Sequence, residues 1–207
     1  MSDAADVAVA PFAPLTLEGA HVRLVPLRFE HVDALFAATH DPELWQWTVA
    51  HVETRDDLRR FVEKALLQTR QGTSVAFLTL ERATGAVAGT TRFMNYSRVD
   101  RRVEIGSTVV AKAWQRTAIN TEAKLLMLTH AFERLQLLRV ELKTDRLNER
   151  SRAAIARLGA VEEGTLRQHV LTEAGRQRDS VYFSITEAEW PGVKAGLIEK
   201  LGRHAAR

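Results

Sequence analysis

The chain has 207 residues, of which 45% are hydrophobic and 27% are charged, the composition of a globular protein with one core. It contains no cysteine, which excludes disulfides, thiolate metal sites and a cysteine nucleophile, and which suits a reducing cytoplasm. The net charge of +3 comes from arginines spread along the chain without a basic block, so the composition does not favour nucleic-acid binding.

Residues 1–14 begin acidic and contain neither a basic leader nor a long apolar run. We therefore expect a flexible N-terminal tail, with no signal peptide and no membrane span. No linker, repeat or low-complexity tract interrupts residues 15–207. These residues are predicted to form a single cytoplasmic domain.

The N-terminal half predicts strands and two helices. Residues 21–27 are expected to form a strand at a sheet edge, because Pro26 cannot donate to a ladder. Apolar side chains recur at helical spacing in the two segments 29–39 and 55–71. Two strand-like runs, 74–81 and 86–95, flank a turn at Gly85 and predict a hairpin, followed by a strand at 103–110.

In the C-terminal half, segments whose apolar residues recur at helical spacing alternate with strand-like segments. Helices are expected at 121–135, 148–158 and 187–204. Strands are expected at 137–144, 161–171 and 180–185. This order predicts a mixed α/β domain with a sheet of about six to seven strands flanked by helices.

Several common catalytic motifs are absent. The sequence contains no GxSxG, no P-loop, no GxGxxG and no HExxH, and its seven histidines lack ligand spacing. Hydrolase, ATPase, dehydrogenase and zinc-enzyme hypotheses therefore lose support, and no metal is expected.

Residues 104–164, EIGSTVVAKAWQRTAINTEAKLLMLTHAFERLQLLRVELKTDRLNERSRAAIARLGAVEEG, resemble the core of the GCN5-related N-acetyltransferases (GNAT), in the branch of the RimJ/RimL-like ribosomal-protein acetyltransferases. LEGAHVRLVPL, DPELWQWT and RDSVYFSITEAEWP look like the same branch. The resemblance implies a twisted, mostly antiparallel sheet whose parallel strand pair splays at an acetyl-CoA site. It also implies transfer of an acetyl group to a primary amine by direct attack in a ternary complex, the acceptor being a protein N-terminus or a small molecule.

The segment QRTAIN falls on the family's pyrophosphate loop, Q/R-x-x-G-x-G/A, and departs from it at Ala118 and Asn120. The chemistry needs backbone N–H groups at a helix start, so Ala118 is expected in an ordinary right-handed conformation. The guanidinium of Arg116 either pairs with a phosphate or extends into water. The residues that the resemblance assigns to the cofactor are Thr108, Val109, Val110, Gln115, Arg116, Thr117, Ala118, Ile119, Asn120, Thr121 and Asn148.

Glu104 is the candidate general base that the resemblance offers, acting through water. Arg102 shares its strand face, so a salt bridge between the two is an alternative. For the oxyanion, the family uses a backbone N–H around Thr108 to Val110, where the strand bulges.

The tyrosine that serves many family members as an acid falls here on Ile155. Ser151 takes the position from which, in the resembling branch, a serine hydroxyl serves the leaving thiol. Asn148 is expected to cap the helix, and its amide nitrogen could also touch the pantetheine arm.

Other assignments stay open at this stage. Trp45 and Trp47 either shape the acceptor pocket or belong to the core. Arg176 and Arg178 read as solvated charge, with binding of an acidic acceptor or a partner subunit as the alternative. The apolar face of the last helix serves either the core or a homodimer interface. The rival function is a non-catalytic acyl-CoA-binding regulator or sensor, suggested by the altered loop and the missing tyrosine.

Overall fold

The computed structural model describes residues 12–205, so the tail expected at 1–14 lies mostly outside the described residues. Phe12 stacks on Tyr96 with ring centroids 4.1 Å apart. The described chain therefore meets the core from its first residues.

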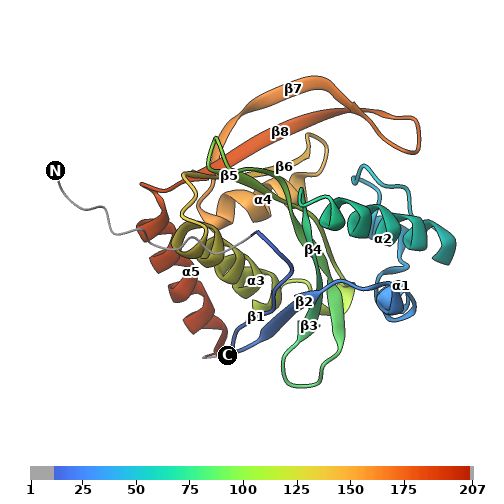
Figure 1. Cartoon of the computed structure of the whole chain (residues 1–207), viewed down its shortest axis with the longest axis horizontal. Coiled ribbons are helices and arrows are strands. Elements are labelled where there is room, and N and C mark those ends of the chain that lie inside the picture. Colours follow the sequence, from blue (N-terminus) through green and yellow to red (C-terminus); the bar gives the residue numbers. More distant parts are fainter. Residues whose placement is uncertain (1–11, 206–207) are drawn as a thin grey trace.

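Within residues 12–205, eight strands form one sheet, in the order β1-β2-β3-β4-β5-β6-β8-β7 (Figure 1). All neighbouring strands are antiparallel except β5 and β6. The strands are β1 (Leu17–Glu18), β2 (Val22–Pro26), β3 (Val75–Glu81), β4 (Val87–Ser97), β5 (Arg102–Val110), β6 (Arg139–Asp145), β7 (Val161–Leu171) and β8 (Gln177–Thr186).

The expected strand count was too low, and the reason is β1. This strand is only two residues long and pairs Leu17 with Leu24 of β2. The expectation that residues 21–27 lie at the sheet edge is also wrong, because β2 stands between β1 and β3. Two residues are too few to show an alternating pattern.

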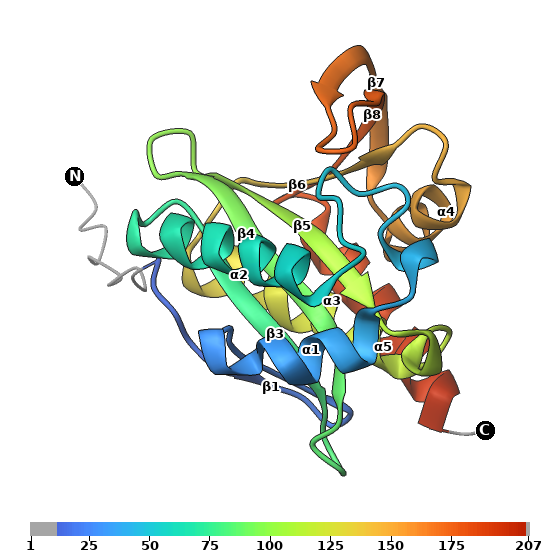
Figure 2. The ribbon, with the colours of Figure 1, turned by 90° about the vertical axis from the view of Figure 1, so that its right-hand side faces the viewer.

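In the part of the chain that the structure describes, five α-helices flank the sheet: α1 (Val32–Thr39), α2 (Arg55–Arg70), α3 (Ala118–Thr129), α4 (Glu149–Leu158) and α5 (Trp190–Ala205). Short 3-10 turns lie at Phe29–His31, Pro42–Leu44 and Lys112–Trp114, and a π-helical turn, His130–Arg134, extends α3. Helices α1 and α2 cover one face of the sheet, and α3 and α5 cover the other (Figures 1 and 2).

Helix α5 packs mainly against the core. Trp190 and Leu197 are buried, Val193 packs beside them, and Ile198 is 52% exposed. Most of the apolar face singled out in the sequence thus belongs to this domain.

A buried carboxylate joins the start of the sheet to α3. Glu122 accepts backbone hydrogen bonds from Ala20, His21 and Val22 at 2.6–2.9 Å. A Cβ on Gly19 would lie 2.4 Å from that carboxylate, so the close approach requires glycine. The β1–β2 turn is therefore fixed to the second turn of α3.

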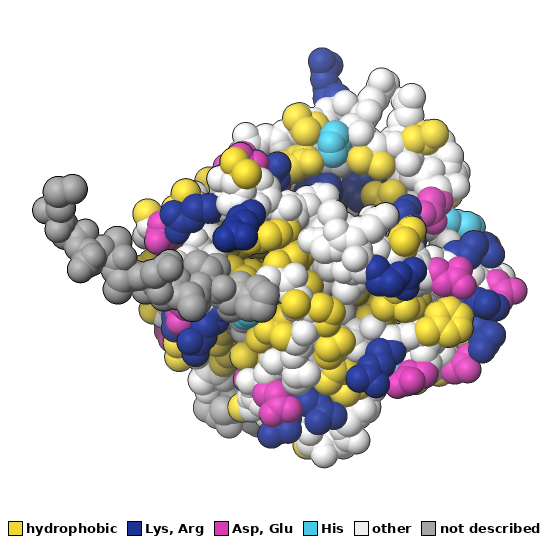
Figure 3. Space-filling model, viewed as in Figure 1, with side chains coloured by type: hydrophobic (Ala, Val, Ile, Leu, Met, Phe, Trp, Pro, Cys, Tyr) yellow, Lys and Arg dark blue, Asp and Glu magenta, His cyan; other side chains and the backbone are white. Residues whose placement is uncertain are grey.

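The surface carries charges of both signs. On the face drawn in Figure 3, Lys and Arg side chains are interspersed with Asp and Glu and form no single basic block. Within residues 12–205, no helix combines the length and the apolar character needed to cross a bilayer.

Candidate active site

Strand β5 is distorted on both of its edges. It pairs with β6 only through three residues, the last pair being Glu104 with Glu141, after which the two strands part. On its other edge the register with β4 shifts between Gly106 and Val109, and Ser107 takes a φ of 45°. This is a β-bulge, at the place where the resemblance implied one.

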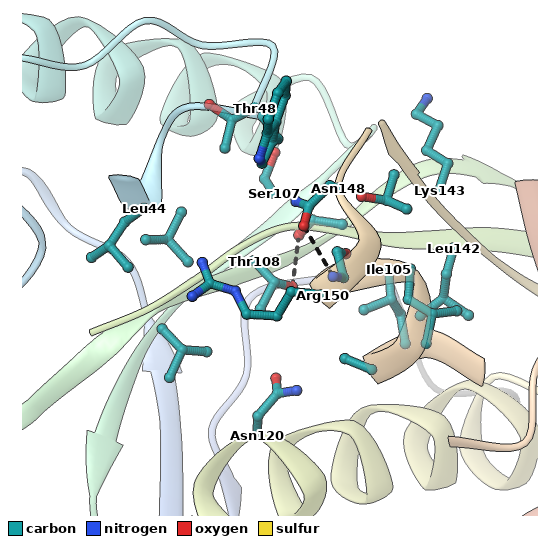
Figure 4. Close-up of a pocket in the computed structure, with 18 of the residues that line it drawn as sticks. Leu44, Thr48, Ile105, Ser107, Thr108, Asn120, Leu142, Lys143, Asn148 and Arg150 are labelled. Atoms are coloured by element: carbon teal, nitrogen blue, oxygen red, sulfur yellow. Dashed lines mark hydrogen bonds between the residues drawn. The ribbon is translucent and has the colours of Figure 1, made fainter. Parts of the chain in front are cut away.

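The gap beside the bulge opens into a cavity of about 710 Å³. Its walls come from β5, β6, α4, the start of α3 and the loop between α1 and α2, and Figure 4 shows Thr108, Asn120 and Arg150 entering it from three of these elements. A space of this size suits a ligand as large as a cofactor arm.

The QRTAIN segment is half loop and half helix. Gln115 to Thr117 form the loop, and Ala118 begins α3 in the right-handed conformation that was expected. The helix starts three residues earlier than predicted, because the Thr117 side chain caps it by accepting from the N–H of Ile119 at 3.3 Å. Other N–H groups of this first turn have no intrahelical acceptor and are available to a phosphate.

The left-handed position in the loop is Arg116, with a φ of 61°. Glycine adopts this conformation without steric cost, whereas arginine does not. The Arg116 side chain is exposed at the cavity rim.

Gln115 connects the two sides of the cavity. Its Nε2 donates to the carbonyl of Val110 at 3.1 Å, at the end of β5. Its Oε1 accepts from Arg150 of α4 at 3.3 Å. Gln115 thus joins the strand that carries the bulge to the helix that carries Ser151.

The cavity brings together most of the predicted cofactor residues. Those that line it are Thr108, Val109, Val110, Gln115, Arg116, Thr117, Asn120 and Asn148. Three others, Ala118, Ile119 and Thr121, have buried side chains and are not among the lining residues. Their side chains secure α3 in the protein.

Glu104 lines the cavity and is only 2% exposed. Its carboxylate accepts from Asn95 Nδ2 at 2.8 Å and forms an ion pair with Lys143 Nζ at 3.0 Å. The alternative pairing with Arg102 is wrong, because that guanidinium lies 3.5 Å from carboxylates of Asp100 and Glu141. Lys143 comes from the neighbouring strand and was not detected as its partner from sequence.

Asn148 and Ser151 lie together in the first turn of α4, and both line the cavity. Asn148 is the N-cap that the sequence predicted, since its Oδ1 accepts from the N–H of Ser151 at 3.0 Å. Ile155, where the family tyrosine would stand, is buried.

The two tryptophans differ in environment. Trp45 is 4% exposed, and its Nε1 donates to the carbonyl of Thr39 at 2.7 Å, so it is mainly a core residue that touches the cavity. Trp47 is half-buried on the cavity wall, and the guanidinium of Arg176 lies 5.3 Å from its ring.

The expectation of solvated charge at the last hairpin is wrong for Arg178. This residue is 6% exposed and lines the cavity. Arg176 is partly exposed and forms an ion pair with Asp145. Arg178 lies on β8, whereas Arg176 precedes that strand, and the sequence alone did not identify which face of β8 points inward.

Lys124 is a cavity residue that sequence reasoning missed. It is 4% exposed, and its Nζ donates to Thr91 Oγ1 at 2.9 Å and to Thr108 Oγ1 at 2.7 Å. Burial lowers its pKa to about 7. A signal was available, because Lys124 precedes Met127 by three residues and so shares the buried face of α3.

Across residues 12–205, no cluster of three or more His, Asp or Glu side chains could hold a metal ion. The polar groups of the cavity are instead cations, amides, hydroxyls and one buried carboxylate.

The family described as "Acetyltransferase (GNAT) domain" matches residues 21–161, more than half of the chain. The chain belongs to the GNAT acetyltransferases. Members of this enzyme family take acetyl-CoA as the acetyl donor, and the GNAT assignment confirms the resemblance drawn from residues 104–164.

Relatives of known structure agree with the GNAT fold. A GCN5-related N-acetyltransferase from Brucella melitensis is 31% identical, with a TM-score of 0.83 over 91% of this chain and 86% of that one. Mycobacterium smegmatis RimJ in complex with CoA-disulfide is 24% identical, with a TM-score of 0.77 over 93% and 97% of the two chains, a likeness of fold alone.

A curated relative places this GNAT chain near the ribosomal branch. YdaF of Bacillus subtilis (strain 168), provisionally named a ribosomal N-acetyltransferase, is 37% identical over 110 residues, which are 53% of this chain. The match spans 59% of YdaF.

Proposed function

We propose that this protein transfers the acetyl group of acetyl-CoA to a primary amine by direct attack in a ternary complex. The observation that carries the proposal is the cavity between β5 and β6, which has helix-start N–H groups at one end and the buried Glu104 at the other. The acceptor is a protein N-terminus or a small-molecule amine. The likeness to YdaF supports the first, and the cavity serves either.

The residues around the cavity fit coenzyme A chemically. The first turn of α3 offers backbone donors for the pyrophosphate, with Arg116 and Arg150 as cations at the same rim. The Asn148 amide, on the opposite wall, would donate to the pantetheine arm. When bound, acetyl-CoA supplies an acyl group activated as a thioester.

The roles of the reacting side chains follow from their positions. Glu104, through a water, would accept the proton that the attacking amine loses, and Lys143 and Asn95 hold its carboxylate in place. A backbone N–H on the bulged segment from Thr108 to Val110 would donate to the oxyanion. The Ser151 hydroxyl would deliver a proton to the leaving sulfur.

Two substitutions test these roles against the rival function, a non-catalytic acyl-CoA sensor. Glu104→Gln and Ser151→Ala should each lower kcat by about a hundredfold or more while acetyl-CoA still binds with nearly unchanged affinity. A sensor would show no acetyl transfer in the wild type, and neither substitution would remove anything catalytic. Calorimetric titration of acetyl-CoA beside a thiol-release assay separates the two outcomes.

The acceptor class requires its own comparison. Wild-type protein is offered ribosomal-protein N-terminal peptides and a panel of small primary amines under the same acetyl-CoA concentration. Preference by kcat/KM for one group identifies the acceptor class. Absence of transfer to either group, with acetyl-CoA bound, would favour the sensor.

A further inference from the structure

Arg178 is a buried cation that no carboxylate contacts directly within residues 12–205. It lies on β8, lines the cavity and is 6% exposed. It takes part in no ion pair among residues 12–205, and its Nε is buried without a hydrogen-bond partner. Removing a charge from water without pairing it costs several kcal/mol, so a bound anion would relieve a real penalty.

The carboxylates near Arg178 are already engaged. Asp145 is 1% exposed and pairs with Arg176, and Glu104 pairs with Lys143 at 3.0 Å. Arg178, Arg176 and Lys143 thus face two carboxylates, which leaves one positive charge in excess at this end of the cavity. A ligand with one negative charge would balance it.

The charges around Arg178 also act on the neighbouring His169. Burial lowers the pKa of His169, and Lys143 and Arg178 lower it further, while Glu104 opposes them. Burial also lowers the pKa of Arg178, against the nearby carboxylates that raise it. The local environment therefore disfavours additional positive charge and favours an anion.

The tip of the β7–β8 hairpin closes the cavity wall near Arg178. The N–H of Glu173 donates to the carbonyl of Val49 at 2.9 Å, and Lys64 of α2 donates to the Glu173 carboxylate at 3.3 Å. Two residues before Arg178, Arg176 lies over the ring of Trp47. The hairpin and the α1–α2 loop thus form one wall around this end, which favours a compact ligand over a long chain.

We propose that Arg178 binds a carboxylate carried by the acceptor, so that the acceptor is a small primary amine bearing an acid group. The inference rests on the proposed acetyl transfer. It concerns the end of the cavity that holds Glu104, whereas coenzyme A phosphates have Arg116 and Arg150 at the α3 end. A guanidinium forks onto a carboxylate through two parallel N–H donors, and a lysine at this position could not reproduce that geometry.

Matched amines test the proposal. Wild-type protein is assayed with glycine and glycinamide and with β-alanine and β-alaninamide. The members of each pair are compared at equal concentrations of unprotonated amine, so that they differ only in the carboxylate. We expect kcat/KM to favour the carboxylate member by at least about tenfold, and Arg178→Gln to abolish that preference with little change for the carboxamide. Equal rates for both members of each pair, or equal losses for both in Arg178→Gln, would overturn the proposal.

A control substitution and further substrates test whether the carboxylate preference depends on Arg178 and on the acceptor end of the cavity. Arg146→Gln removes a 59% exposed arginine of the α4 side and should keep the preference. An increase in the KM for acetyl-CoA alone in Arg178→Gln would place the guanidinium at the coenzyme and contradict the proposal. Preference for phosphoethanolamine over β-alanine, or acetylation of peptides only, would contradict a small carboxylate acceptor.

Binding measurements separate this inference from the proposed function. Acetyl-CoA is titrated calorimetrically into wild type and Arg178→Gln, and β-alanine is titrated by NMR in the presence of coenzyme A. Binding of acetyl-CoA without any acetyl transfer would defeat the proposed function, and Arg178-dependent binding of β-alanine over β-alaninamide would still support the carboxylate site. Equal binding of the two compounds would overturn the site whether or not acetyl transfer occurs.

Discussion

Lys124 Nζ donates a 2.7 Å hydrogen bond to Thr108 Oγ1, so a buried lysine of α3 directly contacts the bulged part of β5. The two hydroxyls that hold this amine, those of Thr91 and Thr108, are also 2.8 Å from one another. Removing the amine would therefore leave the two hydroxyls paired.

Lys124→Met should stabilise the protein below pH 7. The pKa of Lys124 is about 7 in the folded protein against 10.5 for the ordinary group, so below pH 7 both states are protonated and the burial penalty is complete. Between pH 7 and 10.5 only the unfolded chain keeps the proton, and wild-type stability rises with pH. We expect Lys124→Met to gain on the order of 1–4 kcal/mol at pH 6, and less at pH 9.

Urea unfolding at pH 6 and pH 9 checks the Lys124 prediction. Lys64→Met, which removes a lysine with a 61% exposed side chain, controls for the loss of one charge. A gain that is the same at both pH values, or a loss at pH 6, would contradict a buried ammonium.

Arg116→Gly should raise the free energy of unfolding by about 1 kcal/mol, because it relieves a left-handed residue. Arg116→Ala keeps the strain and should not be stabilising. If the guanidinium pairs with a phosphate, both variants lose several-fold in acetyl-CoA affinity. Calorimetry together with urea unfolding separates the two effects, and Arg116→Ala matching Arg116→Gly in stability would refute the strain argument.

Gly106→Ala should impair catalysis more than folding. A Cβ there would lie 2.7 Å from Met94 Cε and 2.9 Å from Glu104 Oε1. Met94 can move, whereas the carboxylate is held by Asn95 and Lys143, so we expect kcat to fall at least about tenfold with a stability loss of about 1–3 kcal/mol.

The control for Gly106→Ala is Gly192→Ala on α5, where a Cβ meets no atom within 4 Å. It should leave kcat unchanged. Normal turnover by Gly106→Ala would show that the Glu104 carboxylate need not stay where the structure has it.

Two substitutions of Asn148 distinguish its role as a helix cap from a role in binding the cofactor. Asn148→Ala removes the acceptor for the Ser151 N–H and should cost about 1 kcal/mol of stability, whereas Asn148→Asp keeps a cap oxygen and should cost little. Both lack the amide N–H donor and should weaken acetyl-CoA binding about five- to tenfold. Undiminished binding by Asn148→Asp would restrict this residue to its structural role.

Local patterns predicted much of the fold. Helix α2 ends within one residue of the expected bounds, because its amphipathic spacing begins at a capping box between Thr54 and Asp57. The start of α3 was misplaced because Thr117 was not recognised as a cap. The edge strand β1 has only two residues, which are too few to show an alternating pattern in the sequence.

Site residues could be predicted from the sequence where they belong to one continuous segment. Gln115, Asn148 and Ser151 line one cavity, and each belongs to a motif that is local in sequence. Their roles in binding and catalysis stay predictions. The partner of Glu104 was missed because Lys143 reaches it from another strand, 39 positions away. The burial of Arg178 likewise depends on which sheet face the hairpin turns inward.

The three N–H groups that bind Glu122 set an order on folding. They lie 100 to 102 positions before the carboxylate that accepts them, so this contact closes a very long loop. During synthesis from the N-terminus, β1 and β2 must wait for α3 before the turn between them can lock. Residues 20–22 thus reach their native hydrogen bonds only after α3 has been made.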